Sequence, residues 1–438
     1  MLVAGLAAPL TAQPPGDRGP CEQITAACQA AGFTQGGARA GAGLQVDCIV
    51  PIMQGAPQPR RASKPLPQVD PQLVAACRSS NPRFGQGGVP PAAPAARPLP
   101  VTSDSPPSGL VVVLPPGQQR DHSSDLRALN NPFMSGVALQ IDWRDIEPAQ
   151  GKPDWSRLDE LFAAAESSNK WVQLLIFPGF FSPAWALEGA ETDLFAIQYG
   201  PGRGTVAKLP MPWDRAYLDR WFAFLKQLSD RYGRSPAFKL MAAAGPTSVS
   251  AEMTLPIKRP DVAKWLDHGY TSRRYLDAWE RVLRAYAEDF PDQCVSLSAP
   301  GLPLLDQGRV VDAPAHSRAR QAIIDQGTRV LGRRFAIQWS DLHAGRAAVE
   351  APDQTSTVIG YSGRIITGLQ MRTSAEGSSG VMGAEGNPPL ALRRSIDKGM
   401  ELNGAGQHVN YLEVYRPDVL ADEMQPVLQY AASLFARK

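Results

Sequence analysis

Carboxylates near the ends of short apolar runs are the residues of this chain best suited to chemistry. Glu413 lies inside the apolar stretch YLEVY, where a carboxylate is costly unless it is paired or used. Two carboxylates whose surroundings push their pKa values apart can serve as an acid and its ionised partner. Four carboxylates follow or lie within such runs: Asp142, Glu252, Asp341 and Glu413.

Aromatic side chains stand close to the same run ends. Their faces offer a large apolar area with a polar group at the edge, which suits stacking on sugar rings, although packing between helices is an equally good reading of each residue alone. We expect four of them to contact a ligand: Trp143, Trp185, Trp339 and Tyr415. His343 could join a site with Asp341 or bond only to the backbone. With five histidines and no HxH or HExxH pattern, we expect no catalytic metal and no cofactor.

Eight short apolar runs must position these side chains. Helical patterns such as DRAYLDRWFAFLKQLSDRYG and SRRYLDAWERVLRAYAEDF separate them. Apolar strands that alternate with helices indicate a parallel sheet buried on both faces. We therefore predict an α/β fold, a (β/α)8 TIM barrel over residues 109–438, with strands at 110–115, 135–143, 170–179, 238–245, 294–301, 334–341, 365–372 and 408–415. The alternative is an open doubly wound sheet, but no GxGxxG follows the first strand.

The stretch WRDIEPAQGKPDWSRLDELF (143–162) shows how one strand, loop and helix unit is built. Pro148 must end the strand before it, and Gly151 with the next proline supplies a turn. Asp154 or Ser156 can cap a helix whose apolar residues recur at helical spacing. Glu147, just before Pro148, is best explained as a structural acceptor.

Two loops give the chain a resemblance to a known family. W-x-x-I-E-P-x-x-G-x-x-D-W after the second strand and GFFSPAWAL after the third resemble the retaining glycoside hydrolases of clan A, among them β-galactosidase-like and cellulase-like members. The segment YLDRWFAFLKQLSDRYGRSPAFKLM resembles the helix and strand that lead to their acid/base residue. The resemblance covers about residues 109–438 and implies a barrel that acts on O-glycosidic bonds.

The sequence departs from that family at both catalytic positions. The resemblance implies an acid/base Glu after strand 4, yet this region reads AAAGPTSVSAEM and its first carboxylate is Glu252. It implies a nucleophilic Glu on strand 7, where GLQMRT places Gln370. An amide cannot attack an anomeric carbon.

Other carboxylates could replace the missing pair. We expect Glu252 to act as general acid and Glu413 as nucleophile or base, with Asp142, Asp341 and Gln370 binding substrate. Structural roles compete with this assignment, because Glu413 could form a salt bridge with Arg372 or Arg416, and Glu252 could cap a helix.

Four of the five cysteines lie in the first fifth of the chain: Cys21, Cys28, Cys48 and Cys77. An even, clustered set predicts two disulfides, with three possible pairings, in a small helical cysteine module over 14–80. The module resembles small cysteine-containing modules of exported bacterial proteins. Reduced thiols are the alternative, and a zinc site is disfavoured because no CxxC pair is present.

The remaining N-terminal segments suggest export. Residues 1–13 read as the remnant of a signal peptide that lacks its basic region, and residues 81–108 as a Pro/Ala/Gly-rich linker. A formal net charge of +2 with mixed signs gives no reason to expect nucleic acid as a partner, and no apolar run is long enough to span a membrane.

Two functions remain after this reading. The first is an exported glycoside hydrolase-like protein, periplasmic or extracellular, that acts on an oligo- or polysaccharide. The second is a catalytically inactive barrel that binds carbohydrate or a cell-surface partner. Gln370 favours the second, whereas Glu413 and the two intact loops favour the first. An unrelated barrel enzyme is a third possibility, but nothing in the sequence supplies its cofactor site.

Overall fold

The computed structural model describes residues 19–35, 40–55, 58, 62–81, 84–85, 106–116, 122–198, 202–246, 253, 255–298, 305–306, 309–310, 313–345 and 354–436. The chain divides into two compact units, Met1–Pro94 and Ala95–Lys438. The expected signal-peptide remnant (1–13) and most of the expected linker (81–108) lie outside the described residues.

The first unit is small and helical. Its elements are α1 (Pro20–Ala30), the π-helical segment η2 (Leu44–Ile49), α2 (Val50–Gln54) and α3 (Pro71–Ser80). Asp70 caps α3 by accepting the amide of Gln72 at 2.8 Å. Disulfides join Cys21 to Cys77 and Cys28 to Cys48, which confirms the predicted two bridges and selects one of the three pairings. Cys28, Cys48 and Cys77 belong to a buried core that also includes Ile24, Phe33 and Met53.

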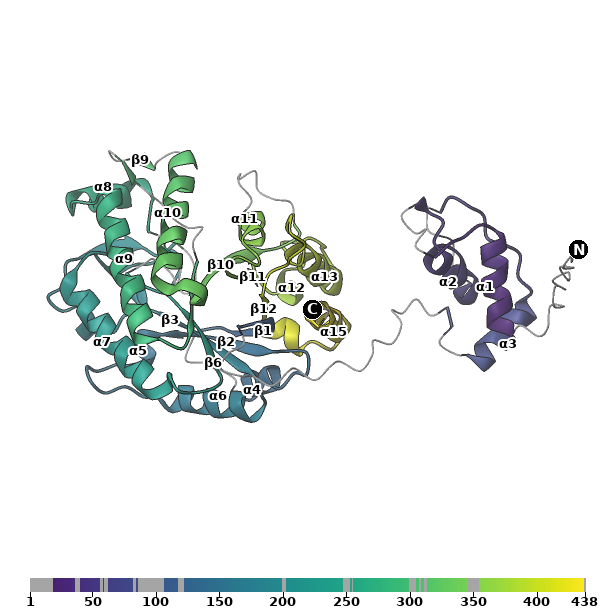
Figure 1. Cartoon of the computed structure of the whole chain (residues 1–438), viewed down its shortest axis with the longest axis horizontal. Helices are drawn as coiled ribbons and strands as arrows, with labels where there is room; N and C mark the ends of the chain where they lie inside the picture. Colours follow the sequence, from purple (N-terminus) through teal and green to yellow (C-terminus); the bar gives the residue numbers. More distant parts are fainter. Residues whose placement is uncertain are drawn as a thin grey trace, which may run out of the picture. The chain divides into compact units, whose positions relative to one another are not determined.

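The second unit contains a closed barrel of eight parallel strands (Figure 1). The closed order is β1-β12-β11-β10-β7-β6-β3-β2, so the barrel prediction is confirmed and the open sheet is excluded. Each predicted strand is present: β1 (Gly109–Leu114), β2 (Gly136–Asp142), β3 (Trp171–Phe177), β6 (Phe238–Ala242), β7 (Cys294–Leu297), β10 (Phe335–Leu342), β11 (Ile366–Met371) and β12 (Tyr411–Tyr415).

Helices surround the barrel and bury the outer faces of the strands (Figure 1). They are α4 (His122–Leu129), α5 (Trp143–Ile146), α6 (Ser156–Ser167), α7 (Arg215–Tyr232), α8 (Arg259–Asp267), α9 (Ser272–Asp289), α10 (Ala313–Leu331), α11 (Gln354–Gly360), α12 (Ala375–Ser378), α13 (Pro388–Gly399), α14 (Arg416–Leu420) and α15 (Gln425–Phe435). Short 3-10 turns occur at η3 (Gly179–Phe181), η4 (Ala184–Leu187), η5 (Gly332–Arg334) and η6 (Asp422–Met424).

Two antiparallel hairpins extend the connections between barrel strands. One pairs β4 (Thr192–Ala196) with β5 (Val206–Pro210), and the other pairs β8 (Leu305–Asp306) with β9 (Arg309–Val310). The first lies between β3 and α7 in the chain, and the second between β7 and α10. Both therefore belong to connections that follow the carboxyl ends of barrel strands, the end at which TIM-barrel sites are found.

Two aromatic side chains fill the amino-terminal end of the barrel. Trp171 begins β3 and Tyr411 begins β12, and their rings meet edge to face at 5.8 Å between centroids. Glycines on neighbouring strands make room for them. A Cβ at Gly136 would lie 2.6 Å from the Trp171 ring, and one at Gly368 would lie 2.0 Å from the Tyr411 ring. We call Trp171 and Tyr411 the aromatic floor.

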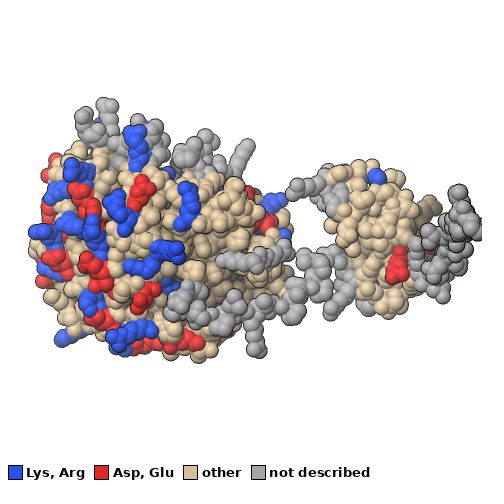
Figure 2. All heavy atoms as spheres, in the orientation of Figure 1, with Lys and Arg blue, Asp and Glu red and all other residues tan. Residues whose placement is uncertain are grey.

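The described surface carries charges of both signs. Figure 2 shows basic and acidic side chains interspersed over the barrel face in view. Among the described helices, none combines the length and the apolar character that crossing a membrane requires.

Candidate functional site

Glu413 is buried in the interior of the barrel. Side chains alternate along a strand, so Glu413 shares the inward face of β12 with Tyr411 of the aromatic floor. It is 0% exposed, and neither carboxyl oxygen has a hydrogen-bond partner among the described residues. Burial raises its pKa to about 8, and the nearby amides of Gln173 and Gln338 act in the opposite direction without forming a well-aligned hydrogen bond. The carboxyl group is therefore largely neutral at pH 7.

Amide side chains from three other strands accompany Glu413. Gln173 on β3 donates to Oε1 of Gln338 on β10 at 3.1 Å, and the Tyr411 hydroxyl donates to the same oxygen at 2.8 Å. Gln370 on β11 pairs in register with Glu413, and its Nε2 is buried without an acceptor among the described residues. We call these five residues the interior polar cluster. A buried donor and acceptor left unpaired are costly, so the cluster is suited to a water or a ligand group.

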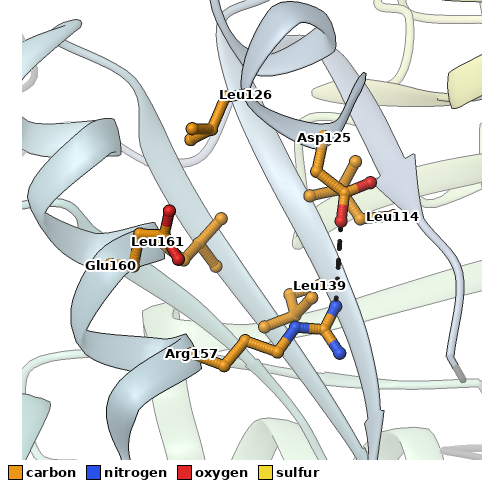
Figure 3. A pocket seen from close by; sticks show the side chains of 7 residues that line it. All are labelled: Leu114, Asp125, Leu126, Leu139, Arg157, Glu160 and Leu161. Atoms are coloured by element: carbon orange, nitrogen blue, oxygen red, sulfur yellow. Dashed lines mark ion pairs between the residues drawn. The ribbon is translucent and has the colours of Figure 1, made fainter. Parts of the chain in front are cut away.

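The salt bridges to Arg372 or Arg416, the structural alternative to a catalytic role for Glu413, are not formed. Arg416 instead donates to Asp125 at 2.6 Å, and Arg372 lies 3.5 Å from Asp341. Arg157 approaches the same carboxylate at 4.0 Å beside a small apolar cavity of about 20 Å³ (Figure 3). The structural reading of Glu413 as an ion-pair partner was therefore wrong.

The other carboxylate candidates lie at the mouth or outside the described residues. Asp142 ends β2, is 5% exposed, and accepts from Arg144 at 2.9 Å. Asp341 lies near the end of β10, where the register to β11 shifts between Trp339 and Leu342. Glu252, the expected general acid, lies outside the described residues. The structure therefore gives no separation between Glu252 and Glu413.

Polar groups gather at the ends of β10 and β11. Arg372 directly follows β11, its guanidinium lies 3.5 Å from Asp341, and its Nη1 lies 3.4 Å from Nε2 of His343. The Arg372 and Asp341 side chains are 47% and 39% exposed, so both can meet a ligand from solvent. We call Asp341, His343 and Arg372 the mouth cluster. His343 lies beside Arg372, the position that corresponds to the first of the two roles left open for it by the sequence.

The two loops that carry the family resemblance pack together through Glu147. Its carboxylate accepts Nε1 of Trp143 at 3.1 Å and the amide of Gly151 at 2.8 Å. Its carbonyl oxygen accepts Nε1 of Trp185 at 3.0 Å. Glu147 is 1% exposed. It therefore fixes both loops, as expected for a structural acceptor.

The aromatic candidates divide between core and mouth. Trp143 is 0% exposed and packs edge-on against Trp185, so the structure gives it a packing role in place of the expected ligand contact. Gln338 points into the barrel, where it bonds to Gln173. Because side chains alternate along a strand, the next residue, Trp339, lies on the outer face of β10. Trp185 stays half-buried beside the core. Tyr415, half-buried, ends β12 on the face that carries Glu413.

Sequence reasoning did not single out Gln173, Gln338 and Tyr411. A signal was present, because Gln173 interrupts WVQLLIF and Gln338 interrupts FAIQW at positions where apolar residues are the rule. A polar residue inside an otherwise buried strand indicates an inward-facing bond. Among the described residues, no group of three or more His, Cys, Asp or Glu side chains could hold a metal ion.

Comparisons with known proteins find likeness of fold. No family model and no curated protein matches the chain. The catalytic domain of beta-amylase from Paenibacillus polymyxa aligns at 10% identity with a TM-score of 0.48, over 76% of this chain and 100% of that one. Xylanase 10B from Thermotoga petrophila aligns at 12% identity with a TM-score of 0.43, over 70% of this chain and 82% of that one. Beta-galactosidase from Halorubrum lacusprofundi aligns at 12% identity with a TM-score of 0.44, over 75% of this chain and 58% of that one. At these identities the likeness concerns the glycoside hydrolase-like barrel fold alone.

Proposed function

We propose that the barrel binds carbohydrate at its carboxyl-terminal mouth without hydrolysing glycosidic bonds. The observation that carries this proposal is that Gln370 is paired in strand register with Glu413, whose carboxyl group is fully buried. Most glycoside hydrolases use two carboxyl groups that flank the scissile bond. Here an amide occupies the position at which the family resemblance places the nucleophile, and the neighbouring carboxyl is buried and largely neutral.

The mouth offers groups that suit sugar binding. Arg372 and Asp341 are partly exposed and can exchange hydrogen bonds with ring hydroxyls. Tyr415 adds an aromatic face and a hydroxyl at the end of β12. These three residues, with Gln370 below them, form the surface that we propose for the ligand.

Hydrolysis is the second candidate function. It is favoured by the raised pKa of Glu413, because a carboxyl that stays protonated near neutral pH can act as a general acid. In this alternative Glu252 supplies the second carboxyl. Sequence reasoning gave these two residues the opposite roles, with Glu252 as acid, and the burial of Glu413 supports the exchange.

Binding and hydrolysis can be separated with one set of proteins. The full chain is titrated with neutral cello-, xylo-, manno- and galacto-oligosaccharides by calorimetry, and the same mixtures are assayed for new reducing ends. We expect at least one sugar to bind, no reducing ends to form, and the double variant Arg372→Ala/Tyr415→Ala to weaken binding at least tenfold. Glu401→Gln, an exposed substitution, is the control. Reducing ends that disappear in Glu413→Gln would establish the hydrolase instead, and binding to no sugar would refute both.

We also infer that the protein works in an oxidising compartment, as expected for an exported chain. The support is the pair of disulfides in the first unit, since such bonds persist outside the reducing cytosol. Thiol labelling of the native protein in fractionated cells tests this inference. Labelling of Cys21, Cys28, Cys48 and Cys77 without reductant would contradict it.

A further inference from the structure

A second concave surface lies on the barrel between α7 and α9, which lie side by side in Figure 1. It is an open groove of about 540 Å³. Its lining residues are Trp213, Arg215, Thr271, Arg273, Arg274, Asp277 and Arg281. Four arginines and one aspartate give this arginine groove a formal charge of +3 (four minus one). On a chain whose formal net charge is only +2, that concentration of positive charge is local.

Two of the arginines are held in place by neutral groups. The Arg274 guanidinium lies 4.3 Å from the Trp213 ring centroid, and its Nη1 donates to the carbonyl oxygens of His268 and Gly269 at 3.0 and 3.2 Å. Arg281 donates to the carbonyl oxygen of Trp213 at 3.5 Å. Carbonyl and ring partners orient a guanidinium without neutralising its charge. Both groups therefore stay available to an anion.

The other two arginines are exposed at the groove edge. Arg215 has no carboxylate within ion-pairing distance among the described residues, and Arg273 faces Asp277 at 3.7 Å with its side chain 92% exposed. An exposed pair of this kind contributes little free energy. Asp214 also lies beside the groove, where its carboxylate accepts the amides of Tyr217 and Glu191 and keeps its negative charge. With Asp214 included, the formal charge of the groove and its edge is +2 (four minus two).

The amino-terminal end of α9 adds to the positive potential, whereas the Asp214 carboxylate at the cap of α7 offsets that of α7. α7 begins at Arg215 and α9 begins at Ser272 after the Thr271 cap, whose hydroxyl accepts the Arg274 amide at 3.1 Å. The amino-terminal ends of helices carry partial positive charge. The indole Nε1 of Trp213 is a further donor, buried and without an acceptor among the described residues.

The groove lies at the same end of the barrel as the proposed sugar-binding mouth. A helix that connects two parallel strands begins at the carboxyl end of the first strand. α7 follows β3 and α9 follows β6, so both begin at the mouth end. A saccharide that is longer than the mouth can therefore extend into the arginine groove.

We propose that the arginine groove binds an oligosaccharide that carries carboxylate or sulfate groups. This proposal rests on the proposed function, since it places the anionic part of a longer sugar in the groove. Planar guanidinium groups form paired hydrogen bonds with such oxyanions. Single-stranded nucleic acid fits less well, because the Trp213 ring is covered by Arg274 and is 5% exposed, so it offers no free face for base stacking.

The test uses the full chain, fluorescently labelled probes and two matched double variants. Arg215→Gln/Arg273→Gln removes two positive charges from the groove, one on α7 and one on α9. Lys226→Gln/Arg284→Gln removes two positive charges from exposed positions on the same helices, outside the groove. The probes are an oligogalacturonate, a heparin-derived oligosaccharide, a neutral dextran oligosaccharide and a single-stranded DNA oligonucleotide.

We expect at least one anionic sugar to bind and the groove variant to weaken it tenfold or more, while the control variant changes it less than twofold. Three outcomes would overturn the proposal. The groove and control variants could lose affinity equally, or neither anionic sugar could bind. The third is that DNA binds as tightly as the anionic sugars and loses as much affinity in the groove variant. Failure of the proposed function is distinguishable, because neutral oligosaccharides would then not bind while an anionic sugar still responds to the groove variant.

Discussion

Gln370 and Glu413 occupy paired positions on the neighbouring parallel strands β11 and β12. An amide and a largely neutral carboxyl therefore share one level of the barrel interior, two residues above the contact between Gly368 and the Tyr411 ring. Two ionised carboxylates at this level would repel each other in a medium of low polarity. The arrangement is stable with one titratable group, which is a reason for the glutamine that does not depend on catalysis.

Glu413 should make the stability of the barrel depend on pH. Its folded pKa of about 8 lies above the ordinary value of 4.5, so the folded state binds more protons between these limits and stability falls as pH rises from about 4.5 to about 8. We expect Glu413→Gln to match the parent near pH 4 and to be more stable at pH 8, by up to about 5 kcal/mol.

Urea unfolding across this pH range measures the effect of Glu413. The exposed substitution Glu401→Gln should leave the pH profile of the parent unchanged. A Glu413→Gln profile that stays parallel to that of the parent would show that burial does not raise the pKa of Glu413 in the folded protein.

Glu147 should be required for the packing of the two mouth loops. Glu147→Ala leaves the Trp143 indole and the Gly151 amide without their acceptor, which we expect to cost about 2 to 4 kcal/mol. Glu147→Gln keeps one oxygen acceptor and should cost less. Denaturant unfolding gives the free energies, and tryptophan fluorescence reports on Trp143 and Trp185. The exposed Glu188→Ala, in the loop after Trp185, serves as the control. A loss no larger than that of Glu188→Ala would refute the role.

The architecture of the barrel could be predicted because its outer faces are apolar. The eight strands are recognisable as short runs that alternate with helical patterns, and each run contains a strand of the structure. Glu147 was also placed correctly, since its carboxylate bonds to Trp143 and Gly151 within its own loop. Local sequence was sufficient where neighbours in the chain are neighbours in space.

The interior polar cluster could not be predicted in the same way. Gln173 meets Gln338 across 165 positions of sequence, and Arg416 reaches Asp125 across 291. Such pairs depend on the register between strands and on the packing of helices against the barrel. Neither can be predicted from the spacing of residues within one segment. Alternation along β10 also turned Trp339 outward, although its position near a strand end suggested the mouth.

The disulfides should determine the stability of the first unit and leave the barrel unchanged. Cys21–Cys77 closes a loop of 56 residues and Cys28–Cys48 one of 20. Chain-entropy estimates give contributions of about 4 and 3 kcal/mol respectively. We expect Cys21→Ser/Cys77→Ser to destabilise the first unit more than Cys28→Ser/Cys48→Ser. Hydrogen exchange resolved by peptide distinguishes the units, and loss of protection in β1 or β12 would contradict their independence.

Asp418 should position the loop that follows Arg372 of the mouth cluster. Its carboxylate, on α14, accepts the Ser374 hydroxyl at 2.8 Å and the amides of Ala375 and Glu376 at 2.9 and 2.8 Å. Asp418 is 0% exposed, and its removal leaves the buried Ala375 amide and the two part-buried donors without this acceptor. We expect Asp418→Ala to lower the free energy of unfolding by about 3 to 5 kcal/mol.

The loop held by Asp418 begins directly after Arg372, so its loss should also affect binding. If Ser374 and Ala375 are released, the Arg372 guanidinium is no longer fixed beside Asp341, and sugar affinity should fall even at temperatures where the protein stays folded. Calorimetry well below the unfolding temperature separates this effect from instability. Asp422→Ala, four residues further along and exposed, should change neither quantity. Unchanged affinity in folded Asp418→Ala would show that Arg372 is positioned by β11 alone.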